Sequence, residues 1–165
     1  MLRYPLICVP LFGCLETDKT QNTQEPANRY DILFVVDNSG SMADENASLI
    51  QAFSSFTTPL IDVDYQILLT GQDVGDGQTQ NGTGGLSVDG IIDSASAVSA
   101  FPDALTTLSQ TTGSGMEEPL ETGLLALCRS VSEPPDICFH SSSVFTEVEI
   151  ESNGLFLREG STLIT

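Results

Sequence analysis

Asp37, Ser39 and Ser41 are the residues of this chain whose types and spacing most clearly suggest chemistry, and they alternate with Asn38 and Gly40. One carboxylate and two hydroxyls at alternate positions of a tight turn can point into a common space, and Gly40 lets the backbone bend there. Such oxygens suit hard divalent cations, since Mg²⁺ takes octahedral oxygen ligands and keeps several waters. The pattern therefore predicts a partial cation shell.

A second interpretation of the same segment involves no cation. Asn38, Ser39 or Ser41 could accept hydrogen bonds from the first amide groups of a following helix, as N-cap residues do. The segment's position favours the cation, because it follows a buried strand and precedes a helix, where open α/β sheets carry their ligand sites. The sequence alone leaves both interpretations open.

The elements that must position this segment are a strand before it and a helix after it. Residues 32–36 are consecutive apolar residues bounded by Asp31 and Asp37, which is typical of a strand buried on both faces of a parallel sheet. From Met42 onward the apolar residues recur at helical spacing. A second buried strand is predicted over residues 64–70, and the order strand, helix, strand implies parallel pairing.

The chain continues with further helices, strands and loops. Residues 71–85 are rich in Gly, Gln, Asp and Asn and predict an exposed loop, whose acids do not fall at EF-hand spacings. We expect a short edge strand over residues 86–92, a helix over residues 94–101 that Pro102 interrupts or restarts, and the opening of another strand over residues 161–165. A further helical stripe consists of Leu120, Leu124, Leu127, Cys128 and Val131.

The segment of residues 31–42, DILFVVDNSGSM, resembles the opening strand and metal-ion-dependent adhesion site of the von Willebrand factor type A family. The resemblance extends from about Tyr30 to Thr165, firmly at this motif and loosely elsewhere. It implies an α/β fold of the Rossmann-like three-layer α/β/α type, with a mostly parallel sheet and an antiparallel edge strand. It also implies a bound Mg²⁺, or alternatively Mn²⁺ or Ca²⁺, whose open position is filled by an Asp or Glu carboxylate of a protein partner.

In this family a further hydroxyl, from a later loop, joins the cation shell. The segment of residues 111–115, TTGSG, occupies the equivalent place here. Setting Leu120 against the family's first helix leucine puts Ser114 on the metal-binding threonine, and Thr112 is the neighbour that could substitute. The alternative for Ser114 is a cap on a helix beginning near Met116.

The family's last ligand is an aspartate at the end of the next core strand, usually held through water. That strand is expected to begin near Leu163, and the sequence contains no aspartate after it. We therefore expect a domain that is incomplete at its C-terminus, either a fragment or a decayed copy. A structural remnant that binds neither metal nor ligand is the main alternative to a binding module.

The N-terminal residues differ from the rest of the chain. Arg3 is followed by an apolar run over residues 6–12, and Gly13 precedes Cys14. This pattern resembles a bacterial lipoprotein signal, in which the cysteine after the cleavage site carries lipid and anchors the protein to a membrane. An uncleaved N-terminus is the alternative.

The chain is accordingly divided into a signal segment at residues 1–14, a flexible tether at residues 15–29 and a partial domain at residues 30–165. Between Leu15 and Tyr30 the tether contains no large apolar residue, so it cannot bury enough surface to become ordered. We expect a protein of the bacterial cell envelope, either lipid-anchored or secreted. No apolar stretch reaches the roughly 18 residues that a spanning helix needs.

Composition argues against several other functions. With 23 acidic and 5 basic residues the net charge is −18, so a phosphate backbone would be repelled and nucleic acid is not an expected partner. A single histidine, His140, gives a zinc site little to build from. Cys128 and Cys138 could form a disulfide in an oxidising compartment or stay as two buried thiols.

An enzyme is the remaining alternative. A phosphoryl-transfer fold could use Asp37 as nucleophile, because a strand-ending aspartate in an open sheet can play that part. Such folds usually carry a second aspartate two residues on, and position 39 is serine. We therefore expect a binding module rather than an enzyme.

Overall fold

The computed structural model describes residues 28–74, 84–111, 118–139 and 152–165. Several sequence-based predictions lie outside these ranges: the signal segment with Cys14, the tether up to residue 27, and the loop hydroxyls of Thr112 and Ser114. Within the described ranges, no helix is long and apolar enough to cross a membrane.

Among the residues that the structure describes, four strands form one mixed sheet in the order β3-β2-β1-β4. The strands are β1 (Arg29–Val36), β2 (Asp64–Gly71), β3 (Ile92–Asp93) and β4 (Thr162–Ile164). β1 pairs in parallel with both β2 and β4, whereas β3 pairs antiparallel with β2 at the edge. The chain is thus an α/β protein with a mostly parallel sheet and one antiparallel edge strand, as the sequence predicts.

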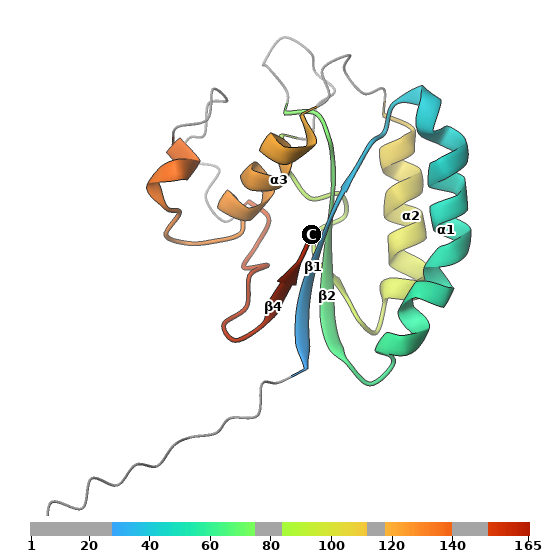
Figure 1. Cartoon of the computed structure of the whole chain (residues 1–165), viewed down its shortest axis with the longest axis horizontal. Coiled ribbons are helices and arrows are strands. Elements are labelled where there is room, and N and C mark those ends of the chain that lie inside the picture. The colour runs from blue at the N-terminus through green and yellow to red at the C-terminus, as the bar shows by residue number, and fades with distance from the viewer. Residues whose placement is uncertain (1–27, 75–83, 112–117, 140–151) are drawn as a thin grey trace, which may run out of the picture.

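The α-helices of the described ranges that pack against this sheet are α1 (Ala43–Thr57), α2 (Ala97–Ser109) and α3 (Pro119–Cys128). Short 3-10 turns accompany them, η1 (Gly40–Met42), η2 (Thr58–Leu60) and η3 (Asp136–Phe139). Figure 1 shows α1 and α2 together on one side of the strands and α3 on the other. The helix predicted from Met42 onward is therefore confirmed, with a 3-10 turn as its first part.

Alternate residues of β1 divide the apolar interior into two clusters. Ile32 belongs to the cluster that contains Phe53 of α1 and Phe101 of α2, whose rings stack with their centroids 3.9 Å apart. Leu33 belongs to the cluster that contains Ala126 of α3. A strand with both faces buried needs the unbroken apolar run that the sequence has, and each fully buried Phe or Leu side chain contributes roughly 1.5–3 kcal/mol.

Three expectations about local structure are wrong. Residues 86–92 do not form a strand, because Asp89 and Gly90 adopt positive φ and turn the chain, so that only Ile92 and Asp93 pair with β2. Pro102 lies inside α2 without interrupting it, since the fully buried residues around it hold the helix against the sheet. Residues 71–73, predicted to be part of an exposed loop, are buried.

Helix α3 also differs from its predicted form. It begins at Pro119 rather than near Met116, with proline in the first turn, where its missing N–H costs nothing. The face it buries carries Thr122, Leu125, Ala126 and Cys128, so Leu120 of the predicted stripe is 89% exposed.

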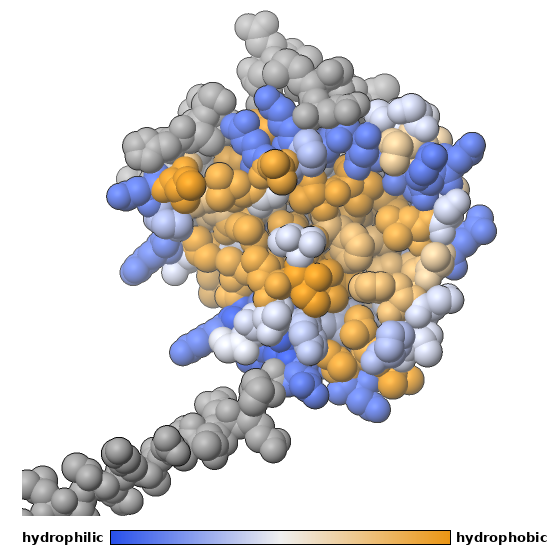
Figure 2. All heavy atoms as spheres, in the orientation of Figure 1, coloured by the Kyte–Doolittle hydropathy of each residue, from blue (hydrophilic) through white to orange (hydrophobic). Residues whose placement is uncertain are grey.

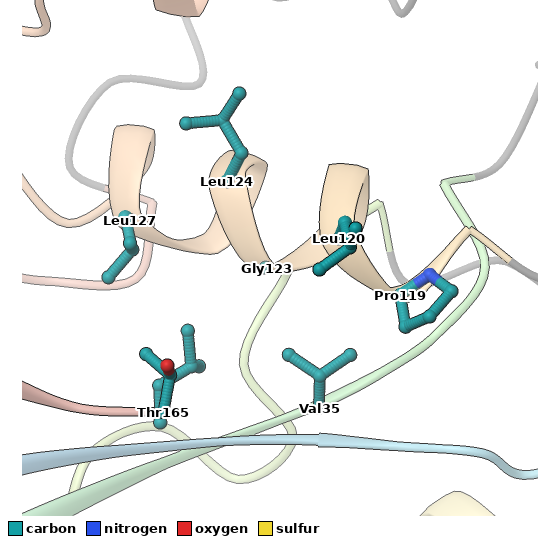
Figure 3. A pocket seen from close by; sticks show the side chains of 8 residues that line it. Val35, Pro119, Leu120, Gly123, Leu124, Leu127 and Thr165 are labelled. Carbon is teal, nitrogen blue, oxygen red and sulfur yellow. The ribbon is translucent and has the colours of Figure 1, made fainter.

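The displaced leucine stripe borders a groove of about 530 Å³ between α3 and the sheet. Figure 3 shows Val35 and Thr165 pointing from the sheet toward the helix, with Leu127 on the opposite side. In Figure 2 apolar side chains gather over β1 and β4, in the middle of this face of the molecule. The exposed Leu120 and the half-buried Leu124 and Leu127 therefore line an apolar surface.

A disulfide joins Cys128, the last residue of α3, to Cys138 in η3, with their Cα atoms 5.7 Å apart. Both residues are buried. Of the two states that the sequence leaves open for this cysteine pair, a disulfide or two buried thiols, the structure has the disulfide.

Candidate metal centre

The predicted cation-binding segment begins where β1 ends. Val36, the last residue of β1, is in register with Gly71, the last residue of β2. Because the two strands are parallel, Asp37 and Gln72 leave the sheet side by side at its carboxyl edge. This is the edge at which open α/β sheets bind their ligands.

The carboxylate of Asp37 is held by hydrogen bonds to one of its two oxygens. Its Oδ1 accepts from the backbone N–H of Ser39 at 2.8 Å and from Nε2 of Gln72 at 2.8 Å. Among the described residues none donates to Oδ2. Two donors on Oδ1 fix the orientation of the group and leave Oδ2 as a potential ligand.

The hydroxyls of Ser39 and Ser41 lie together in the turn that follows Asp37. Ser39 Oγ and Ser41 Oγ are 2.9 Å apart, and either one could be the donor. Adjacent ligands of an octahedral ion with bonds of about 2.1 Å lie about 3.0 Å from one another. The spacing of the two hydroxyls therefore fits neighbouring positions of a Mg²⁺ shell.

The interpretation of this segment as a helix cap is wrong. Ser39 stands at the N-cap position of η1 and Met42 at that of α1, and neither helix start receives a hydrogen bond from the side chain of its cap. The turn is instead closed by the backbone, through a bond from Met42 N–H to the carbonyl of Ser39 at 3.0 Å. The serine hydroxyls are thus not used to satisfy helix amides.

Two asparagines brace the turn against the helices of the first apolar cluster. Asn46 of α1 donates from Nδ2 to the backbone carbonyl of Asp37 at 2.9 Å. Asn38 donates from Nδ2 to Oγ1 of Thr111, just beyond α2, at 2.8 Å. Asn38 Oδ1 is buried and has no hydrogen-bond partner among the described residues. An unpaired buried acceptor costs about 1–3 kcal/mol, and such costs often accompany a functional site.

The two residues that flank positions 112–117, where the two predicted loop ligands lie in the sequence, both bond to neighbours of Asp37. Before these positions, Thr111 accepts the hydrogen bond from Asn38. After them, the N–H of Glu118 donates to the carbonyl of Gln72 at 3.3 Å. Thr112 and Ser114 themselves lie outside the described residues, so their part in a shell stays a prediction.

The donor set fits a hard cation better than a soft one. Within the part of the chain that the structure describes, no three His, Cys, Asp or Glu side chains gather into a metal-binding group. A cation at this turn would therefore be held by the single negative charge of Asp37 and by neutral hydroxyl oxygens. Mg²⁺ and Ca²⁺ accept such ligands, whereas Zn²⁺ favours nitrogen and sulfur.

Sequence reasoning missed Gln72, because the stretch that contains it looked like an exposed loop. Gln72 is only 3% exposed and donates directly to Asp37. A usable signal was present, since two parallel strands predicted to end at residues 36 and 70 must bring the residues after them to the same edge. Asn46 and Thr111 carried no comparable signal, because their contacts depend on how α1 and α2 pack.

Comparisons with protein-family models, with curated proteins and with solved structures found no match for this chain.

Proposed function

We propose that this chain is a divalent-cation-dependent protein-binding module of the von Willebrand factor type A kind, with the cation held by Asp37, Ser39 and Ser41. The observation that carries the proposal is the pair of serine hydroxyls 2.9 Å apart in the turn that begins at Asp37, whose carboxylate accepts hydrogen bonds from the described residues on one oxygen only. This arrangement offers three oxygens to one small ion. It also leaves coordination positions for waters or a partner.

The proposed fold is the Rossmann-like three-layer domain of that family. Its support is the sheet order β3-β2-β1-β4, with helices packed on both faces and the serine motif directly after β1. The parallel pairing of β1 with both of its neighbours agrees with such a domain.

The proposed ion is Mg²⁺, with Mn²⁺ or Ca²⁺ as alternatives. Ser114, or Thr112 in its place, would add a hydroxyl from the later loop. A partner's Asp or Glu carboxylate would then displace a water and bring the negative charge that the site lacks, because Asp37 alone leaves a divalent ion half neutralised. Binding of this kind makes partner affinity dependent on the cation and requires no catalytic group.

The proposed location is the bacterial cell envelope, with lipid on Cys14 as the only membrane attachment. The buried Cys128–Cys138 disulfide supports export, because structural disulfides persist mainly in oxidising compartments. Labelling cells with a fatty-acid analogue should mark the wild-type protein but not Cys14→Ala. Equal labelling of both would remove the lipid anchor from this proposal.

Titration calorimetry with MgCl₂ and MnCl₂ tests the cation site. The wild type should bind one ion, and a Ser39→Ala, Ser41→Ala double variant should bind at least tenfold more weakly, because two inner ligands are lost. Ser48→Ala is the matched control, since the hydroxyl of this exposed serine of α1 donates to the carbonyl of Asp44, away from the turn. Wild-type protein that binds neither ion would refute the proposal.

Partner recognition is tested on a peptide array. Each peptide with an Asp is paired with a peptide that is identical except for an Asn at the same position. Binding that requires Asp, Mg²⁺ and intact Ser39 is the expected result. Binding that persists in EDTA, or that treats Asp and Asn alike, would exclude a carboxylate bound to the cation.

A further inference from the structure

We infer that Gln72 is a positioning residue of the cation site, whose carboxamide turns the Asp37 carboxylate so that Oδ2 is the oxygen offered to the metal. The inference rests on the proposed cation site and extends it to the residue that follows the neighbouring strand β2. Gln72 itself does not bind the ion in this account.

The contact that carries the inference joins the ends of two strands. Nε2 of Gln72 lies 2.8 Å from Oδ1 of Asp37, the oxygen that also accepts the N–H of Ser39. Both donors are neutral amides. They fix the carboxylate without neutralising its charge, so the charge stays available to a cation.

Gln72 can act as a rigid support because it is held from α3. Its backbone carbonyl accepts a hydrogen bond from Thr122 Oγ1 at 2.7 Å and one from the N–H of Glu118 at 3.3 Å. Its side chain is almost completely buried. The orientation of the Asp37 carboxylate is therefore linked, through one residue, to the first turn of α3.

A positioning role has a consequence that a purely structural role lacks. Mg²⁺ demands near-ideal octahedral geometry, whereas Ca²⁺ accepts flexible shells with longer bonds. Losing the donor of Gln72 lets the Asp37 carboxylate rotate, which should weaken Mg²⁺ binding more than Ca²⁺ binding. Partial unfolding would weaken both ions by the same factor.

The experiment is calorimetric titration of the full chain with MgCl₂ and, separately, CaCl₂. Gln72→Met keeps the length of the side chain and removes the donor. Mg²⁺ affinity should fall about tenfold to a hundredfold, the usual effect of losing a residue that orients a ligand, and Ca²⁺ affinity should fall several-fold less. The Mg²⁺/Ca²⁺ affinity ratio is therefore expected to drop.

Gln66→Met is the matched control, because Gln66 lies on β2, the strand that Gln72 follows, and donates to the carbonyl of Phe156 instead. It should leave the affinity ratio unchanged. Thr122→Val is the second variant, in case Gln72→Met does not fold. It removes one of the bonds that hold Gln72 and should lower the ratio in the same direction but by less.

The outcomes separate this inference from the proposed function. Wild-type protein that binds neither cation would end both. Wild-type binding with an unchanged ratio in Gln72→Met and Thr122→Val, or with both ions weakened equally, would overturn the positioning role and leave the cation site standing. A ratio that drops in these variants and not in Gln66→Met supports the inference.

Discussion

The two ends of β1 carry the same residue type in opposite states. Asp31 is completely buried, and both of its oxygens are engaged: Oδ1 accepts from Arg158 Nε at 2.7 Å, and Oδ2 accepts from Arg158 N–H and from the hydroxyl of Ser161. Asp37 is half-buried, and its bonds to the described residues come from neutral amides onto one oxygen. The carboxylate at the start of β1 is thus neutralised by an arginine, whereas the described partners of the carboxylate after β1 are neutral.

The partners of the two carboxylates distinguish a structural acid from a candidate metal ligand. Arg158 also bonds to Asp64 at 2.7 Å, so a single guanidinium ties together the beginnings of β1 and β2. At the other end of these strands Gln72 takes the place of an arginine. A neutral donor orients the carboxylate and leaves its charge uncompensated, which is what a metal site requires.

The largest expected effect on stability comes from breaking the internal pair. Asp31→Ala leaves Arg158 short of a buried partner and should lower the free energy of unfolding by about 3 kcal/mol. Urea denaturation measures this loss, and the folded fraction should retain wild-type Mg²⁺ affinity. A loss below about 1 kcal/mol would mean that the ion pair between Asp31 and Arg158 contributes no more than an exposed pair, contrary to its buried contacts.

The disulfide joins α3 to η3 and involves neither aspartate, so its removal tests whether a loss of stability alone changes Mg²⁺ binding. Replacing both Cys128 and Cys138 by alanine removes a link that spans a sequence separation of 10 residues. The expected cost is roughly 2–3 kcal/mol, mainly through the entropy of the unfolded chain. Thermal unfolding of the double variant beside the reduced wild type checks this value. A change in Mg²⁺ affinity in this variant would show that stability and the site are not independent.

The smallest expected effect on stability comes from the ion pairs of Asp64, and it depends on pH. Hydrogen bonds from Arg158 and then from Arg29 hold the pKa of Asp64 below its ordinary value of 3.8. Since the unfolded chain then takes up the proton first, this stabilisation is present above about pH 4 and is lost as the pH falls through the lower folded pKa. Asp64 is half exposed, so the contribution is at most about 1 kcal/mol.

Asp64→Asn should therefore flatten part of the stability decrease between pH 5 and pH 2 and change little at pH 7. Unfolding curves at several pH values measure it. An acid decrease identical to that of the wild type would assign the pH dependence to other carboxylates.

The sequence predicted the parts of this fold that local patterns determine. The apolar run of residues 32–36 gave β1, the helical spacing after Met42 gave α1, and the alternation of Asp37, Ser39 and Ser41 gave a turn whose hydroxyls indeed meet. It could not distinguish Asp31 from Asp37. Their partners, Arg158 and Gln72, lie 127 and 35 residues away in sequence, and only the packed sheet brings them together.

Helix α3 shows the same limit. Its leucines have helical spacing, yet the core takes Thr122 and Leu125 because Gln72 and the second apolar cluster fix the rotation of the helix. Periodicity predicts that a face is buried. Contacts with distant residues decide which face it is.

The most direct test of the cation site is the stabilisation that Mg²⁺ gives to the folded chain, compared between the wild type and Asp37→Asn. With MgCl₂ at 100 times the dissociation constant, wild-type protein should gain about 2.7 kcal/mol in the free energy of unfolding, with a corresponding rise in Tm. Asp37→Asn keeps the shape of the side chain but loses its charge, so it should gain nothing at the same concentration. Equal stabilisation of the two proteins by Mg²⁺ would contradict a cation bound at Asp37.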